Sequence, residues 1–200
     1  MSTDAATHRS SNLVPVELSP FRSPAAWTAF LLPFVTGLIL DQATKRWAFD
    51  RLLIDLHPTP DGRYRPESFV NEFIPGWLHF EVTVNQGAVF GLGQGQRILF
   101  VLVSVGAIYL LGHMFARSAG QRSYQIVLGM LLAGVLGNLY DRITYGYVRD
   151  MIHAVPRWGI FPWIFNVADT LLCVGVALIV AHNLWQAVAG KKPPASPSTV

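Results

Sequence analysis

The sequence predicts an all-α membrane protein, a four-transmembrane-helix bundle with a small extracytoplasmic β-sheet. Three observations lead to this fold class. The 200-residue chain is 52% hydrophobic and only 14% charged, which is too apolar for an ordinary soluble domain. Four segments are long and apolar enough to cross a bilayer. A further segment alternates apolar and polar residues with the period of a strand.

The four membrane segments follow from length and hydropathy. A spanning helix needs about 20 mostly apolar residues, because the bilayer core offers its backbone no water to bond. The first segment runs from about Trp27 past Leu40 and ends in the polar sequence DQATK. Pro33 within it is tolerated as a kink in a bundle. The other three cover residues 98–116, 123–140 and 167–190.

Charge predicts how the segments are oriented. Four spans leave both termini on one side of the membrane. Arg117 and Arg122 lie in the short loop between spans two and three, and Lys191 and Lys192 follow span four. Because such positive residues mark the cytoplasmic side, we expect both termini in the cytoplasm and the acidic segment 52–95 outside.

The chain therefore divides into three parts. Residues 1–26 form a cytoplasmic N-terminal tail, and residues 191–200 form a cytoplasmic C-terminal tail. Residues 27–190 form the four-span domain, with its extracytoplasmic β region at about 52–95. In that region the run LHFEVTVN at 78–85 has the alternation of a half-buried strand. We expect a small sheet resting on the outer membrane surface.

Polar residues gather where all four spans reach the outer side. These are Asp41 and Lys45 in span one, Asn85 and Gly87 before span two, Asn138, Asp141 and Arg142 ending span three, and Asn166 and Asp169 starting span four. Ionisable groups at membrane depth are costly unless paired or hydrated, so these residues are functional candidates.

Each of them also has a structural explanation. Asp41 and Lys45 can neutralise each other one helical turn apart, Asp141 can pair with the adjacent Arg142, and Asp169 can cap a helix. Two carboxylates at one level on consecutive spans, each near an asparagine, favour a joint function. Close carboxylates share a proton, so one can activate water while the other protonates a leaving group. The pair Asp141 and Asp169 is therefore predicted to be catalytic.

Other classes of protein have less support. A transporter needs ionisable groups spread across the bilayer, whereas the inner halves of spans two to four contain almost none. Histidine spacing fits no metal motif, and Cys173 is the single cysteine, so we expect no metal or other cofactor. The net charge of +3 forms no basic stripe, which argues against a nucleic-acid partner.

Four motifs resemble lipoprotein signal peptidase, the signal peptidase II family of aspartyl peptidases. They are DQATK at 41–45, NQGAVFGL at 85–92, GVLGNLYDR at 134–142 with GYVRDMI at 146–152, and FNVADT at 165–170. The resemblance covers about residues 27–189. It implies a multi-pass enzyme of the bacterial inner membrane, acting as a monomer in contact with membrane lipid. Its substrate would be a diacylglyceryl-modified prolipoprotein, cut just before the lipidated cysteine, and globomycin would inhibit it.

The resemblance also implies roles for residues. Asp141 and Asp169 become the catalytic dyad, without a metal. The residues implied to bind substrate or support the dyad are Asp41, Lys45, Asn85, Gly87, Asn138, Arg142, Asn166 and Ala168. Three features depart from the family pattern. Ala133 stands in place of a glycine, Arg149 replaces a residue that is most often apolar, and residues 57–68 look like an insertion.

Overall fold

The structure is a computed structural model that describes residues 19–60, 63–87, 96–159 and 163–189. Most of the predicted tail 1–26 and all of the tail 191–200 lie outside the described residues. So does the part of the motif at 85–92 that follows Gly87.

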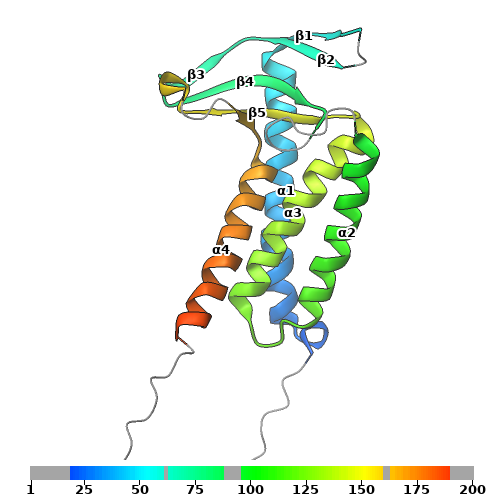
Figure 1. Ribbon diagram of the computed structural model, residues 1–200, viewed down its shortest axis with the longest axis vertical. Helices are drawn as coiled ribbons and strands as arrows, with labels where there is room; N and C mark the ends of the chain where they lie inside the picture. Colours follow the sequence, from blue (N-terminus) through cyan, green and yellow to red (C-terminus); the bar gives the residue numbers. More distant parts are fainter. Residues whose placement is uncertain (1–18, 61–62, 88–95, 160–162, 190–200) are drawn as a thin grey trace, which may run out of the picture.

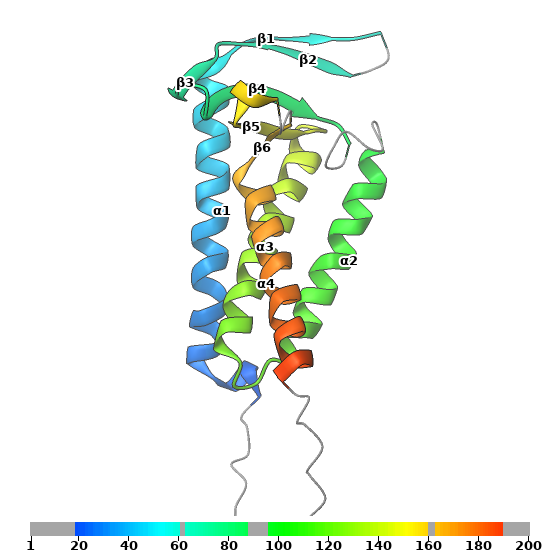
Figure 2. The same cartoon turned by 60° about the vertical axis from the view of Figure 1, so that its left-hand side comes forward.

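Four long helices form a bundle, and the strands gather at one end of it (Figures 1 and 2). The helices are α1 (Pro24–Leu52), α2 (Arg97–Ala116), α3 (Arg122–Thr144) and α4 (Val167–Ala189), with short 3-10 helices at Pro20–Arg22 and Pro156–Trp158. All four long helices have the length and apolar composition of a membrane span. The four predicted helices are therefore confirmed.

Helix α1 continues well past the apolar segment from which it is predicted. Its start is fixed by Pro24 at the first position and by the Ser23 hydroxyl, which accepts the Ala26 N–H. Its 29 residues span about 44 Å, more than the roughly 30 Å of a bilayer core. The polar sequence DQATK consequently lies inside the helix, and the last turns reach the sheet.

Helix α3 is the centre of the bundle. Of its most apolar stretch 61% is buried, against 11% for α2. A Cβ atom at Gly134 would lie 2.7 Å from the Ala168 carbonyl oxygen on α4, and one at Gly137 would lie 2.5 Å from Asp41 Oδ2 on α1. Only glycine allows such close approach, so the small residues of α3 let α1 and α4 pack tightly against it.

The strands form two antiparallel sheets. β1 (Leu53–Pro58) and β2 (Tyr64–Ser68) make a hairpin, and the second sheet has the order β3 (Asn71–Ile74), β4 (Leu78–Asn85), β5 (Val148–Ala154), β6 (Ile164–Phe165). The predicted strand at 78–85 is confirmed as β4. The class all-α is too narrow a description, because these strands are a substantial second layer, with two sheets where one was expected.

The order of the larger sheet positions the site. β5 follows α3 and β6 precedes α4, so their pairing brings the end of α3 beside the start of α4. On its other side β5 pairs with β4, with Thr83 opposite Asp150 and Val84 opposite Arg149. Buried Met151 and Val82 pack against Ala48 at the end of α1. Helices α1, α3 and α4 therefore meet the sheet within a few residues of β5.

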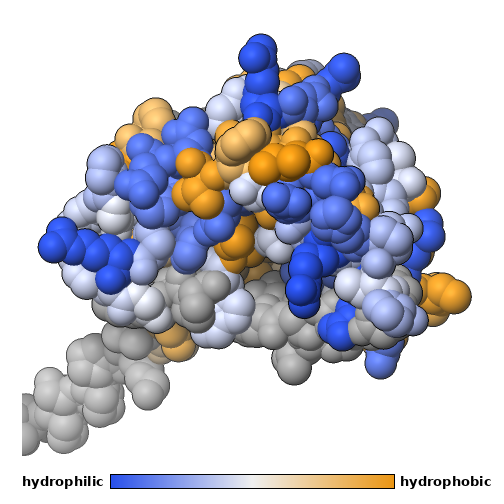
Figure 3. Space-filling view, turned by 90° about the horizontal axis from the view of Figure 1, so that it is seen from above, coloured by the Kyte–Doolittle hydropathy of each residue, from blue (hydrophilic) through white to orange (hydrophobic). Residues whose placement is uncertain are grey.

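Seen from the sheet end, the surface carries hydrophilic side chains around a central apolar group (Figure 3). Exposed apolar residues on and beside β3 include Phe69, Phe73 and Trp77. A surface that mixes large aromatic side chains with charged ones is typical of a membrane–water interface.

Candidate active site

All ten residues that the sequence singles out lie where the bundle meets the sheet, and contacts join them into one network. Two arrangements of carboxylates can be separated within it. One pair of aspartates is held by cations, and the other is held by amides.

The first arrangement, called here the ion-paired cluster, comprises Asp41, Lys45, Asp141 and Arg149. Lys45 Nζ lies 2.8 Å from Asp41 Oδ2 and 3.2 Å from Asp141 Oδ2. The Arg149 guanidinium reaches Asp141 Oδ1 at 2.8 Å through Nη2 and at 3.2 Å through Nε. The Arg149 backbone N–H also donates to Asp141 Oδ2, at 3.0 Å. Asp141 is fully buried, and both of its oxygens accept from cations.

Asp41 ties this cluster to the start of α4. Its Oδ1 accepts the Ala168 backbone N–H at 2.8 Å, and its Oδ2 accepts the Gln42 amide at 2.9 Å. Gln42 in turn accepts from Arg149 Nη2 at 2.8 Å. The intrahelical Asp41–Lys45 pair that the sequence indicates is therefore present, and it also positions the residue next to Asp169.

The second arrangement, called here the amide-held pair, comprises Asp150 on β5 and Asp169 on α4. Asn166 Nδ2 donates to Asp150 Oδ1 at 2.5 Å, and the Asn166 backbone N–H donates to Asp169 Oδ2 at 3.4 Å. Asn138 Nδ2 donates to Asp169 Oδ1 at 2.8 Å. In the part of the chain that the structure describes, neither carboxylate forms an ion pair.

Asn166 and Asp169 also cap α4. The Asn166 Oδ1 accepts the Asp169 N–H at 2.9 Å, and Asp169 reciprocates toward the Asn166 N–H, in the manner of a capping box. The capping role that the sequence allows for Asp169 is thus real. It fixes the carboxylate beside Asp150 and does not compete with a chemical role.

Asn138 connects the two arrangements. Its Oδ1 accepts from Lys45 Nζ at 3.1 Å and from Asn166 Nδ2 at 3.2 Å, while its amide holds Asp169. Because those two contacts occupy the oxygen, the amide nitrogen must face Asp169. A change in the ion-paired cluster will therefore be felt at the amide-held pair.

The remaining predicted residues form the side of the site nearest α2. Asn85 is hydrogen-bonded to Asp150 and accepts the Gly87 N–H at 3.0 Å. Arg142 donates to the Gly87 carbonyl at 2.8 Å, and its guanidinium lies 5.0 Å above the Phe100 ring. The Asp141–Arg142 pair that the sequence allows as a structural alternative is absent from the described ion pairs, because Arg142 turns toward Gly87 instead.

Environment separates Asp150 from an ordinary aspartate. Burial, and then the negative charge of Asp169, raise the pKa of Asp150 well above its usual range. The site holds four aspartates and the three cations Lys45, Arg142 and Arg149. One proton shared by Asp150 and Asp169 would balance these charges. The arrangement can therefore present a carboxylic acid and a carboxylate side by side.

Comparison with known proteins decides the family. The family model described as signal peptidase (SPase) II matches residues 34–185. The chain belongs to the signal peptidase II family. A relative in Methylobacterium radiotolerans, named lipoprotein signal peptidase, is 36% identical over 90% of this chain and 95% of its own length. Another of that name, in Methylorubrum extorquens, is 34% identical over 87% of this chain and 92% of its own length.

Solved structures agree with this membership. A bacterial membrane enzyme determined by the in meso method at 2.3 Å resolution superposes with a TM-score of 0.69 and 28% identity. The match covers 84% of this chain and 94% of the solved one. The signal peptidase II chain described here is accordingly a membrane protein with four long apolar helices.

The sequence does not predict a role in this signal peptidase II site for Asp150 or Gln42, and it marks Arg149 only as a departure from the family pattern. Asp150 lies in the motif GYVRDMI. This motif forms the strand β5, so a prediction based on ionisable residues at the ends of spans does not include it. One signal could have found it. Asp150 lies among the apolar residues of the segment YVRDMI, and burying a carboxylate in a strand costs as much free energy as burying one in a helix. No three described His, Cys, Asp or Glu side chains are grouped as metal ligands.

Proposed function

We propose that this aspartic peptidase removes the signal peptide from diacylglyceryl-modified prolipoproteins and cuts before the lipidated cysteine. Membership of the signal peptidase II family and relatives named lipoprotein signal peptidase support this substrate class. The observation that carries it is the amide-held pair, a buried and a half-buried carboxylate without a cation, at the end of a bundle of apolar helices.

Asp169 is one member of the catalytic pair in this proposal. The sequence pairs it with Asp141, and the contacts favour Asp150. A general acid or base must keep a lone pair or proton for the substrate. Asp141 accepts from Lys45 and from Arg149 on both oxygens, whereas Asp150 shares Asn166 with Asp169. Asp141 then acts as the anchor that fastens β5 to α1 and α3.

The two aspartates divide the chemistry. Asp169 is the base, because the Asn138 and Asn166 N–H groups donate to its oxygens and stabilise the ionised form. It takes a proton from water, whose oxygen attacks the scissile carbonyl. Asp150, with its raised pKa, supplies the proton that polarises the carbonyl oxygen. The tetrahedral intermediate then collapses as a proton passes to the leaving amine of the cysteine.

The other residues position this pair. Asp41 holds the Ala168 N–H and Asn138 holds Asp169, so α1 and α3 together fix the first turn of α4. Arg142 and Asn85 hold the backbone at Gly87, which we propose borders the bound substrate. We propose that the enzyme acts as a monomer, because the hydrogen bonds that hold both carboxylates are complete within one chain.

We further propose a bacterial inner-membrane location with both termini in the cytoplasm and the site near the outer face. The described chain ends lie at the same end of the bundle as the α2–α3 connection, which carries Arg117 and Arg122 (Figure 1). The opposite end carries the sheet. A protease-cleavable tag between β1 and β2 should be cut in spheroplasts, while tags at either terminus should be protected. Protection of the β1–β2 tag would overturn this placement.

The activity itself is tested with purified protein in detergent. A diacylglyceryl prolipoprotein should be shortened to the lipidated mature form, and globomycin should block the reaction. The same prolipoprotein without its diacylglycerol is the matched control and should remain intact. No shortening of the lipidated substrate by well-folded protein would overturn the proposed function.

A further inference from the structure

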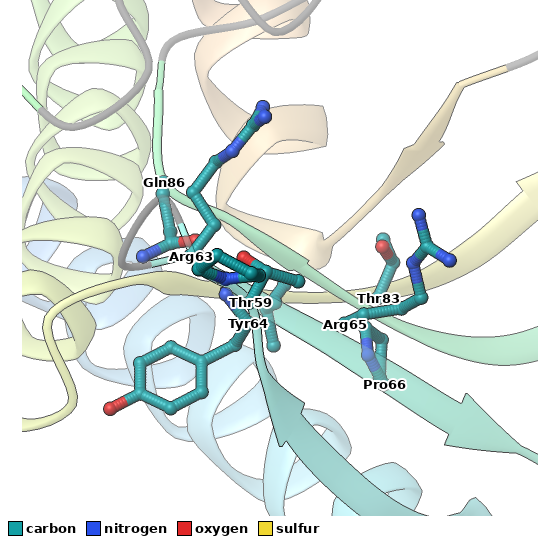
Figure 4. Close-up of a pocket in the computed structure, with 9 residues that line it drawn as sticks. Thr59, Arg63, Tyr64, Arg65, Pro66, Thr83 and Gln86 are labelled. Atoms are coloured by element: carbon teal, nitrogen blue, oxygen red, sulfur yellow. Dashed lines mark hydrogen bonds between the residues drawn. The ribbon is translucent and has the colours of Figure 1, made fainter.

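A cavity of about 580 Å³ lies between the β1–β2 hairpin and β4 (Figure 4). Its polar lining comprises Thr59, Arg63, Tyr64, Arg65, Thr83 and Gln86. The hairpin overlaps residues 57–68, the stretch that looks like an insertion in the sequence. Neither the catalytic pair nor its supporting residues use this cavity.

The cavity adjoins the candidate active site. Thr83 in its wall is paired across the sheet with Asp150, and Gln86 in its wall separates Asn85 from Gly87. The hairpin is held in place over this end of β4. The Tyr64 N–H donates to Gln86 Oε1 at 3.0 Å, and the Tyr64 ring lies 5.7 Å from the Tyr147 ring. A chain leaving the site past Thr83 would enter the cavity.

Charges along the hairpin are separated. Arg63 and Arg65 are two residues apart in an extended segment, so they project from the same side, and both extend upward in Figure 4. Two carboxylates of the described part of the hairpin lie near His57, Asp55 at 3.5 Å and Glu67 at 3.6 Å. Among the described residues, Arg65 has no ion-pair partner. The cavity therefore presents positive charge and hydroxyl groups.

We infer that this cavity binds the first residues of the mature lipoprotein after the cleaved bond and prefers acidic side chains there. The inference rests on the proposed function. The signal peptide before the bond is apolar and lies among the helices, so the segment that emerges over the sheet is the polar mature one. The Arg65 guanidinium and the Thr83 hydroxyl are donors suited to carboxylates.

The test uses three synthetic lipopeptides that are identical up to the diacylglyceryl-cysteine. The residues that follow it include two Asp in the first, two Asn in the second and two Lys in the third. We expect kcat/KM to be highest for the Asp peptide, by about fivefold over the Asn peptide. The difference should shrink in high salt, because exposed charges are screened. Equal rates for the Asp and Asn peptides would overturn the inference.

Variants locate the preference. Arg63→Gln with Arg65→Gln should lower the rate for the Asp peptide to that for the Asn peptide. Arg46→Gln with Arg51→Gln removes the same charge from the exposed end of α1 and should keep the preference. A preference that survives in the first double variant, or that follows the phosphatidylglycerol content of the micelle instead of the peptide, would contradict the inference. Failure to cleave any of the three peptides would instead contradict the proposed function.

Discussion

The ion-paired cluster and the amide-held pair contain the same side chain at the same level of the bundle, yet they are suited to different tasks. Asp141 is surrounded by Lys45 and Arg149, and its charge is already balanced. Asp150 and Asp169 receive only N–H groups from amides. A buried carboxylate that is paired with cations is suited to a structural role, whereas a buried and a half-buried carboxylate without a cation favour sharing a proton. The contacts of each aspartate therefore indicate its role better than its position along a membrane span does.

The largest expected effect separates the proposed catalytic pair, Asp150 and Asp169, from Asp141. Asp150→Asn and Asp169→Asn should each lower cleavage by about 10³-fold or more, because an amide can neither take a proton from water nor share one. Both proteins should remain folded and membrane-inserted. Cleavage of the diacylglyceryl prolipoprotein is the measurement, and substantial turnover by either variant would remove that residue from the pair.

Asp141→Asn is expected to act on stability instead. It leaves Arg149 buried without an anion and removes one of the two carboxylates that contact Lys45. The loss should lower the free energy of unfolding by about 3–5 kcal/mol. The thermal unfolding midpoint in detergent measures this loss. Because a poorly folded protein also cleaves slowly, Asp141→Asn alone does not separate the two assignments.

The double change Asp141→Asn with Arg149→Met separates them. Methionine removes the buried charge and places an apolar residue at 149. The double variant should therefore regain much of the lost stability and cleave at a measurable rate. A well-folded double variant without any turnover would restore Asp141 as the catalytic partner of Asp169.

A pH series tests the environment of Asp150 through its effect on stability. The pKa of Asp150 is higher in the folded protein than in the unfolded chain, whose value is roughly 3.9. The folded state therefore binds this proton more tightly, and the free energy of unfolding falls as pH rises from that value through the raised pKa.

Asp150→Asn should consequently remove this loss. The asparagine resembles the protonated acid and can still accept from Asn166. At neutral pH the variant should unfold at a higher temperature than the parent, while the two should converge in acid. An Asp150→Asn protein that is less stable than the parent at neutral pH would show that Asp150 is ion-paired like Asp141.

Much of this contrast could not be predicted from sequence, and the reason is physical. Hydropathy is a local property, so the four helices and β4 follow from it closely. The Asn166–Asp169 cap is also local, four residues in one turn. The environment of Asp141 depends on Arg149, which reaches it only because β5 folds back over the end of α3. Asp150 faces Asp169 only through the pairing of β5 with β6.

The smallest expected effect concerns Asp41 and Lys45, the residues that link the ion-paired cluster to the amide-held pair. Lys45→Ala leaves Asp41 buried without a cation, so it should reduce the folded yield more than Asp41→Asn with Lys45→Met does. The double variant should fold but cleave about tenfold more slowly. Asp41 Oδ1 holds the Ala168 N–H, and Lys45 holds the Asn138 oxygen, so both contacts that orient Asp169 are weakened. The loss should appear in kcat with little change in KM, because neither side chain lines the cavity under the hairpin.

Asp41→Asn alone is the matched control and should slow cleavage less than the double change does, since its amide oxygen can still accept the Ala168 N–H. A double variant that folds well and cleaves at the parental rate would show that Asp41 and Lys45 only neutralise each other and do not position the proposed catalytic pair.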